Sequence, residues 1–248
     1  MKKEIWNWAA YLWDCLEVMD QLITQWVKVD AIITDPPYWT TACKRDAVIP
    51  FDKMWERLNK LKKPNWPILL FWSEPFSSAL RMSNIKNYKY DWIWDKVLHS
   101  NPLIAKKQPL STHENICVFY NKQPTYNPQM WEWKEIKRWN ETIWNSWTKW
   151  DTKIFRWKDS WKERYPKKII TFSNANKNWI VHPTQKPVEL MEYLIKTYTN
   201  EWELVLDFTA WSFSTCVWAE NLNRKWIWIE LDENYFNIWC ERIFNFNK

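Results

Sequence analysis

Short apolar runs alternate with amphipathic helical patterns along most of the chain. Runs that are apolar on both faces predict buried strands at Val29–Thr34, Pro67–Phe71, Tyr90–Trp94, Ile116–Tyr120, Leu204–Phe208 and Trp226–Glu230. Helical patterns cover Asp14–Gln25, Asp52–Lys62, Glu74–Ser83, Pro187–Thr199, Phe213–Asn223 and Asn234–Phe244. This alternation predicts an α/β fold, with a mostly parallel sheet covered by helices on both faces.

The chain contains 25 Trp residues and no Gly. Ordinary proteins carry about 7% Gly, so its absence over 248 residues is not a sampling effect. Trp also stands where turns and helix ends favour Gly, after Asn or after a predicted helix, at Trp8, Trp26, Trp66 and Trp179. We interpret these residues as replacements of Gly. The exceptions lie inside regular patterns that suit an aromatic residue, and they are Trp55, Trp92 and Trp94.

Positive charge is concentrated in residues 121–178, which hold 13 Lys/Arg against 6 Asp/Glu, while the whole chain has a net charge of +6. The segment is also rich in Asn, Thr and aromatic residues. A basic lobe of this composition is typical of a nucleic-acid surface. The alternative is a solvated insertion. The length of 248 residues otherwise suits one large α/β domain.

The cysteines and the hydropathy pattern indicate whether the chain binds a metal, forms disulfides or crosses a membrane. The 5 Cys residues are scattered, without the spacing of a metal site. We therefore expect no bound metal and a reducing, intracellular setting. No apolar run reaches the roughly 18 residues of a membrane-spanning helix, so we expect no membrane association.

Asp35-Pro36-Pro37-Tyr38 directly follows the first apolar run. Open α/β sheets place their chemistry at such carboxyl ends of strands. Proline has no N–H group, so the carbonyls after Asp35 remain available as acceptors beside a ring that can stack on a planar substrate. The motif therefore predicts a site for a flat amine. These residues alone also fit a strand that ends in a Pro-Pro turn.

Two further segments are typical of binding sites for a cofactor that contains a ribose. Asp207 ends an apolar run and is followed by a tight loop and a predicted helix. Glu230 ends the next run about twenty residues later, where an acidic side chain can accept hydrogen bonds from ribose hydroxyls. An acidic residue at an ordinary strand end is the alternative for Glu230. The loop His182–Pro187 opens another helix, and Pro suits the first helical turn.

The order of these motifs resembles that of the β-class amino-methyltransferases of DNA, most closely the phage and bacterial DNA adenine methyltransferases. The resemblance rests on Asp35–Tyr38, His113–Asn115, the basic segment, His182–Pro187 and Asp207–Thr215. It implies a Rossmann-like S-adenosylmethionine-dependent methyltransferase fold. Residues 1–120 and 179–248 would form the catalytic and cofactor-binding halves of one domain, and residues 121–178 an inserted target-recognition lobe.

The resemblance also implies methyl transfer from S-adenosylmethionine to the exocyclic amine of adenine in double-stranded DNA, on a flipped base. It assigns catalysis to Asp35, Pro36, Pro37 and Tyr38. It assigns cofactor binding to Asp14, Cys15, Thr184, Lys186, Asp207, Phe208, Ala210, Trp211, Ser212, Thr215 and Glu230. We expect DNA contacts from Lys162, Arg164, Lys167 and Lys168. An Asp at the head of the catalytic motif resembles adenine enzymes more than cytosine enzymes.

Other functions stay open at this point. The family has Gly where this chain has Trp211, and commonly where it has Phe213, so a catalytically inactive variant that at most binds DNA is one alternative. An RNA or protein-amide substrate is another, although the basic segment argues against it. We expect a location in the cytoplasm of a bacterial or phage-infected cell. The oligomeric state is open, with a dimer as one possibility.

Overall fold

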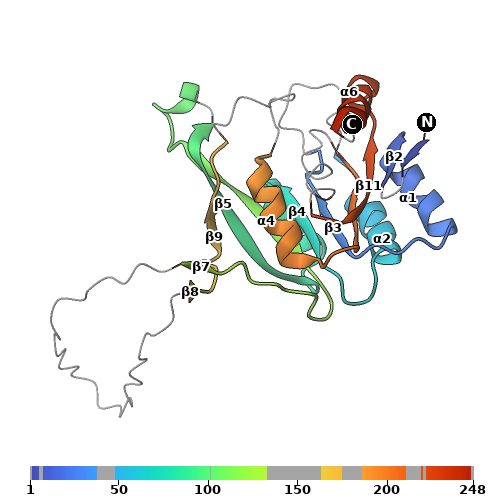
Figure 1. Cartoon of the computed structure of the whole chain (residues 1–248). Helices are drawn as coiled ribbons and strands as arrows, with labels where there is room; N and C mark the ends of the chain where they lie inside the picture. Colours follow the sequence, from blue (N-terminus) through green and yellow to red (C-terminus); the bar gives the residue numbers. More distant parts are fainter. Residues whose placement is uncertain are drawn as a thin grey trace, which may run out of the picture. The chain divides into compact units, whose positions relative to one another are not determined.

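The computed structural model describes residues 2–5, 8–37, 48–100, 102–132, 163–174, 186–210, 219 and 222–246. The chain forms two compact units (Figure 1). The larger unit comprises Met1–Asn127 with Lys167–Lys248, and the smaller one comprises Pro128–Pro166. The larger unit carries the residues that the sequence assigns to catalysis and to the cofactor.

The larger unit is built on a nine-stranded sheet with the order β1-β2-β11-β10-β3-β4-β6-β5-β9. The strands are parallel from β2 to β4, whereas β6 is antiparallel to both β4 and β5. The bounds are β1 Lys2–Ile5, β2 Trp8–Leu12, β3 Ala31–Thr34, β4 Ile68–Trp72, β5 Tyr88–Ser100, β6 Ser111–Phe119, β9 Ile169–Thr171, β10 Leu204–Asp207 and β11 Lys225–Glu230. The smaller unit contains the strand pair β7 Trp131–Glu132 and β8 Glu163–Arg164.

Helices cover both faces of the sheet, because successive strand residues point to opposite sides. Ala31 and Ile33 of β3 pack in one core with α4 and α6, whereas Ile32 packs in a second core with α1, α2 and α3. The bounds of the helices are α1 Cys15–Thr24, α2 Phe51–Leu61, α3 Phe76–Ser83, α4 Val188–Tyr198 and α6 Glu233–Phe246, with a short 3₁₀ helix η1 at Pro102–Ile104. The predicted mostly parallel α/β architecture is confirmed.

Helix α1 ends on a left-handed residue at the place where the sequence suggests a missing glycine. Trp26 has φ 58°, its N–H donates to Ile23 O at 3.0 Å, and Val27 N–H donates to Leu22 O at 3.0 Å. These two bonds form the Schellman motif, in which Gly is the usual residue. A residue with a Cβ in this conformation costs about 1–2 kcal/mol.

Several elements differ from the sequence predictions. Strand β5 is longer than the predicted Tyr90–Trp94, and β1, β2 and β9 were not predicted. Strand β9 lies within the basic segment, yet it pairs with β5 in the larger unit, as Ile93↔Ile169 shows. The predicted helix Phe213–Asn223 falls largely outside the described residues. Within the described part of the chain, no helix is long and apolar enough to cross a membrane.

Candidate active site

An acidic residue stands at the carboxyl end of each of four adjacent parallel strands. In sheet order these are Asp14 just after β2, Glu230 at the end of β11, Asp207 at the end of β10 and Asp35 just after β3. Because the strands are parallel, these residues share one edge of the sheet, the edge at which open α/β sheets bind ligands. The edge is therefore strongly acidic and suits a cationic ligand.

Asp35 has one carboxylate oxygen held by a cation and the other without a partner. Lys186 Nζ lies 2.9 Å from Asp35 Oδ2. Asp35 Oδ1 is buried and receives no hydrogen bond within the described structure. Burial raises the pKa of Asp35 to about 6, against the opposing effect of Lys186 and together with the negative charge of Glu114. A buried acceptor without a donor is costly, so Oδ1 is suited to a donor from a ligand.

Lys186 belongs to a row of alternating positive and negative side chains that ends at Asp35. Its Nζ also lies 2.9 Å from Glu114 Oε2, and Lys96 Nζ lies 3.1 Å from Glu114 Oε1. Burial alone would raise the pKa of Glu114, but Lys186 and Lys96 outweigh it and lower the pKa to about 2. The row Lys96–Glu114–Lys186–Asp35 is largely shielded from water, so its charges act on one another more strongly than surface charges do.

The end of β3 is tied to the end of β10. Thr34 Oγ1 donates to Asp207 Oδ1 at 2.6 Å and lies 2.7 Å from Thr209 Oγ1. The N–H of Thr209 donates to the same Asp207 oxygen at 3.2 Å. Asp207 therefore positions the backbone that leads directly into Asp35.

Glu230 presents a buried carboxylate at the end of β11. Its Oε1 accepts hydrogen bonds from Leu231 N at 2.9 Å and Asp232 N at 2.7 Å. Burial raises the pKa of Glu230 to about 7, although these two backbone bonds oppose the shift. A carboxylate fixed in this way is suited to accept hydrogen bonds from the hydroxyls of a ribose.

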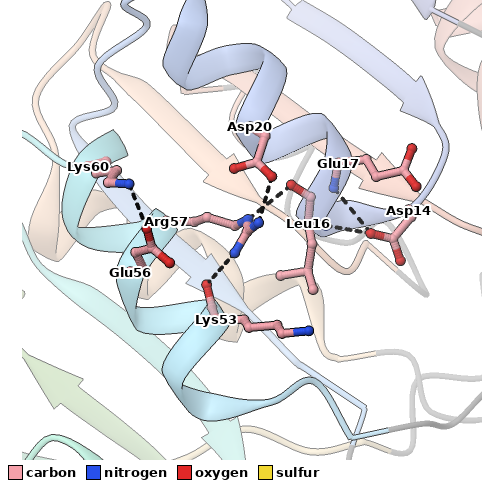
Figure 2. Close-up of polar contacts among 8 residues, drawn as sticks. All are labelled: Asp14, Leu16, Glu17, Asp20, Lys53, Glu56, Arg57 and Lys60. Carbon is pink, nitrogen blue, oxygen red and sulfur yellow. Dashed lines mark hydrogen bonds and ion pairs between the residues drawn. The ribbon is translucent and has the colours of Figure 1, made fainter.

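Asp14 caps the first helix of the site. Its Oδ1 accepts from Leu16 N at 2.8 Å and Glu17 N at 3.2 Å, as expected of an N-cap residue. Figure 2 shows how Arg57 of α2 fixes the same helix, since its Nε donates to Leu16 O at 3.2 Å and its Nη2 lies 2.6 Å from Asp20 Oδ2. Asp14 thus has a structural role, and its contact with the cofactor remains a prediction.

The structure brings together part of the predicted site. Cys15 is half-buried beside Asp14, and burial raises the pKa of its thiol to about 12, which keeps it neutral. Phe208 and Ala210 are buried after β10, so the Phe208 ring faces the core. Other predicted site residues lie outside the described residues, namely Tyr38, Lys162, Thr184, Trp211, Ser212 and Thr215.

The residues expected to contact DNA are distributed over both units. Arg164 lies in β8 of the smaller unit, whereas Lys167 and Lys168 are exposed residues of the larger unit. Lys168 O accepts a hydrogen bond from Ile93 N at 2.8 Å and so leads into β9. Their contacts with DNA remain predictions.

Sequence analysis did not include Lys96, Glu114 and Thr34 in the site. Glu114 belongs to the motif His113–Asn115, on which the family resemblance partly rests, but the sequence did not indicate what Glu114 does. Thr34 reaches the site through a hydrogen bond to Asp207, 173 positions away, and Lys96 through the pairing of β5 with β6, so neither residue stood in a motif of its own.

A family model described as DNA methylase (N6_N4_Mtase) matches residues 29–241. This chain belongs to that family. Among individual proteins, M.HpaI, a type II methyltransferase of Haemophilus parainfluenzae, is 26% identical over 234 residues, covering 87% of this chain and 68% of the relative. M1.MboII, a type II methyltransferase of Moraxella bovis, is 25% identical over 245 residues, covering 90% and 92%. YhdJ, a DNA adenine methyltransferase of Escherichia coli (strain K12), is 39% identical over 62 residues, covering 25% and 21%.

The crystal structure of an M1.HpyAVI–SAM complex superposes with a TM-score of 0.66 at 26% sequence identity, covering 94% of this chain and 98% of the other. The predictions of a DNA amino-methyltransferase, of its Rossmann-like fold and of S-adenosylmethionine as its cofactor are thereby confirmed. For this DNA methylase, the acidic edge and its buried carboxylates fit a cofactor that carries a sulfonium cation and a ribose.

Proposed function

We propose that this DNA methylase transfers a methyl group to the exocyclic amine of adenine in double-stranded DNA, after the base has been flipped out of the duplex. The observation that carries the proposal is the buried Oδ1 of Asp35, which has no hydrogen-bond partner among the described residues, beside Oδ2 held by Lys186. An adenine amine supplies the N–H donor that this oxygen lacks. The name of YhdJ, a DNA adenine methyltransferase, supports adenine over cytosine.

Asp35 and Pro36 act by positioning the amine. The amine is a poor nucleophile because its lone pair is conjugated with the ring. When Asp35 Oδ1 and the Pro36 carbonyl accept its two hydrogens, the nitrogen becomes more pyramidal and its lone pair points at the methyl donor. S-adenosylmethionine would supply the methyl group and leave as a neutral thioether, and the methylated amine would lose one proton, for which Asp35 is the adjacent acceptor.

Glu230 holds the ribose hydroxyls of the cofactor, and Asp207 fixes the loop that passes beside it. S-adenosylmethionine supplies an activated methyl group on sulfur when it is bound. Lys186 keeps Asp35 ionised and oriented, and Pro37 and Tyr38 complete the pocket for the flipped base. The target-recognition lobe binds DNA through Lys162, Arg164, Lys167 and Lys168. The duplex substrate places the enzyme in the cytoplasm of a bacterial or phage-infected cell.

A methyl-transfer assay with radiolabelled S-adenosylmethionine and the Trp211→Gly/Phe213→Gly protein tests this function. Unmethylated genomic DNA is the substrate, and the labelled product is digested to nucleosides and separated. We expect label in N6-methyladenine only. Label in N4-methylcytosine would refute the assignment to adenine, and label in RNA or protein but not in DNA would refute the assignment to DNA.

A further inference from the structure

The hairpin between β5 and β6 extends far beyond Asp35 at the same edge of the sheet. β3, β4 and β5 run in one direction, because β4 and β5 are both antiparallel to β6. The register sets Phe71, Ile116 and Trp92 side by side, level with Asp35. From Trp92, β5 then continues to Ser100, which adds up to about 26 Å at about 3.3 Å per residue. Figure 1 shows this hairpin, with η1 at its outer end.

The outer part of the hairpin, residues 97–110, is apolar and basic; we call it the hairpin tip. Leu103 in η1 is 94% exposed, and Val97 and Leu98 are exposed as well. Lys106 and Lys107 follow η1 and are also exposed. The sequence has no Asp or Glu between Asp95 and Glu114, so the tip itself carries a net positive charge.

We propose that the hairpin tip grips duplex DNA next to the flipped base, with Lys106 and Lys107 on phosphates and Leu103 as an apolar wedge in the groove. This rests on the proposed function, which brings the duplex to Asp35. Lysine–phosphate contacts release counterions from DNA. An apolar side chain inserted at a base step lowers the cost of unstacking, as in other proteins that distort DNA. The combination of an exposed Leu with two Lys and no acid suits this polyanion better than a protein surface.

The lysine contacts are tested by DNA binding alone, without catalysis. Fluorescence anisotropy measures the affinity for a labelled duplex over a series of salt concentrations. The double variant Lys106→Gln/Lys107→Gln should reduce the slope of log K against log salt by about 1.8, since each phosphate contact contributes about 0.9. The control is Lys86→Gln/Lys89→Gln, which removes two exposed lysines at the opposite end of β5. Equal slopes for both variants would overturn the phosphate contacts.

The wedge is tested by comparing duplex with single-stranded DNA as methyl acceptor. Leu103→Ala should lower kcat/KM on the duplex by about tenfold and leave the single-stranded rate unchanged, because a single strand needs no unstacking from a partner. Met82→Ala, at a 71% exposed residue of α3, is the control. Equal losses on both substrates, or none on the duplex, would overturn the wedge. These rates are measured in the Trp211→Gly/Phe213→Gly protein, which we expect to bind S-adenosylmethionine. If that protein methylates no DNA at all, the proposed function fails, and the salt slopes still decide the role of the tip.

A separate observation concerns the tryptophans. Trp26 and Trp202 have φ of 58° and 66°, the left-handed conformation that favours glycine, and their side chains are 85% and 57% exposed. Trp55, Trp92 and Trp94 are buried instead, and their indole N–H groups donate to Ser83 Oγ at 2.8 Å, Tyr198 OH at 2.7 Å and Phe172 O at 2.8 Å. The chain thus contains two kinds of tryptophan. Some are buried and hydrogen-bonded through the indole, whereas others are exposed and have a backbone conformation that favours glycine.

We infer that Trp26 and Trp202 stand at positions that the source organism decodes as glycine. Independent mutations would leave some glycine in a chain of 248 residues. Reading one glycine codon as Trp replaces every glycine which that codon encodes, so the count of zero means that this gene uses the codon for all of its glycines. UGA is a codon of this kind, since it is a stop in the standard genetic code and encodes Trp or Gly in variant codes.

The gene and the protein from its source both test this inference. The codons for Trp26 and Trp202 should be UGA, and those for Trp55, Trp92 and Trp94 should be UGG. Peptide mass spectrometry of the protein from its source should find Gly at 26 and 202. UGG at all five positions, or peptides with Trp at 26 and 202, would overturn it. In the recombinant chain, Trp26→Gly/Trp202→Gly should raise the Tm and Trp55→Gly should lower it.

Discussion

Lys186 Nζ lies at the same distance, 2.9 Å, from Asp35 Oδ2 and from Glu114 Oε2. Lys186 therefore forms ion pairs with two carboxylates, that of Asp35, which we assign to catalysis, and that of Glu114. It also lies 5.3 Å from the centroid of the Phe71 ring, a contact that favours the charged ammonium. Burial, Lys186 and Glu114 together set the pKa of Asp35. Three predictions follow from these contacts.

Asp35→Ala removes the acceptor for the adenine amine. Methyl transfer should fall by a factor of about 10² or more, as for the loss of other preorganised polar partners. DNA affinity should change little, because Asp35 carries no phosphate contact. Single-turnover methyl transfer and anisotropy measure the two quantities, and near-full methylation by the variant would show that another group orients the amine.

Lys186→Gln should move the acidic limb of the pH–activity profile to higher pH. Asp35 acts as its carboxylate, so kcat/KM should fall as the pH drops through its pKa of about 6. Lys186 lowers that pKa, and without its charge Asp35 takes up a proton at higher pH. An acidic limb that stays in place would mean that Asp35 is not the group that titrates.

Glu114→Gln should move the same limb in the opposite direction. Glu114 raises the pKa of Asp35 through its negative charge and shares Lys186 with it. The variant keeps a side chain of similar shape, removes one negative charge and leaves Lys186 to Asp35. A purely structural role would lower kcat without moving the limb, so the direction of the shift separates the two explanations.

The ends of the helices were predictable from the sequence because local chemistry sets them. Asp14 caps α1 through Leu16 N and Glu17 N, and Pro187 directly precedes α4, so both helices agree with the prediction to within about a residue. Strand β2 escaped prediction because Trp8–Leu12 is short and pairs with β11, which is distant in sequence.

The row of charges Lys96–Glu114–Lys186–Asp35 could not be predicted in the same way. Lys186 and Glu114 are 72 positions apart. They meet because α4, which follows Lys186, packs in one core with β6, which carries Glu114. Strand order is a property of the whole fold, and no spacing of residues expresses it. The acidic strand ends at Asp35, Asp207 and Glu230 were predictable, because each closes an apolar run of its own.

Trp211 should weaken the binding of S-adenosylmethionine. By the resemblance described above, the family has a glycine at this position, directly after Ala210, which would let the backbone approach S-adenosylmethionine. An indole side chain is far larger than the single hydrogen of glycine. We expect the chain with Trp at this position to bind S-adenosylmethionine weakly or undetectably in calorimetry. Trp211→Gly/Phe213→Gly should restore measurable affinity.

Trp66→Gly is the matched control. Trp66 follows a turn after α2, where its ring contacts Lys63 at 5.3 Å, and it lies far along the chain from the residues assigned to the cofactor. This substitution should change the Tm and leave cofactor affinity as it was. Tight binding by the unaltered chain would contradict the prediction, because the loop would then have a route around the cofactor that needs no glycine.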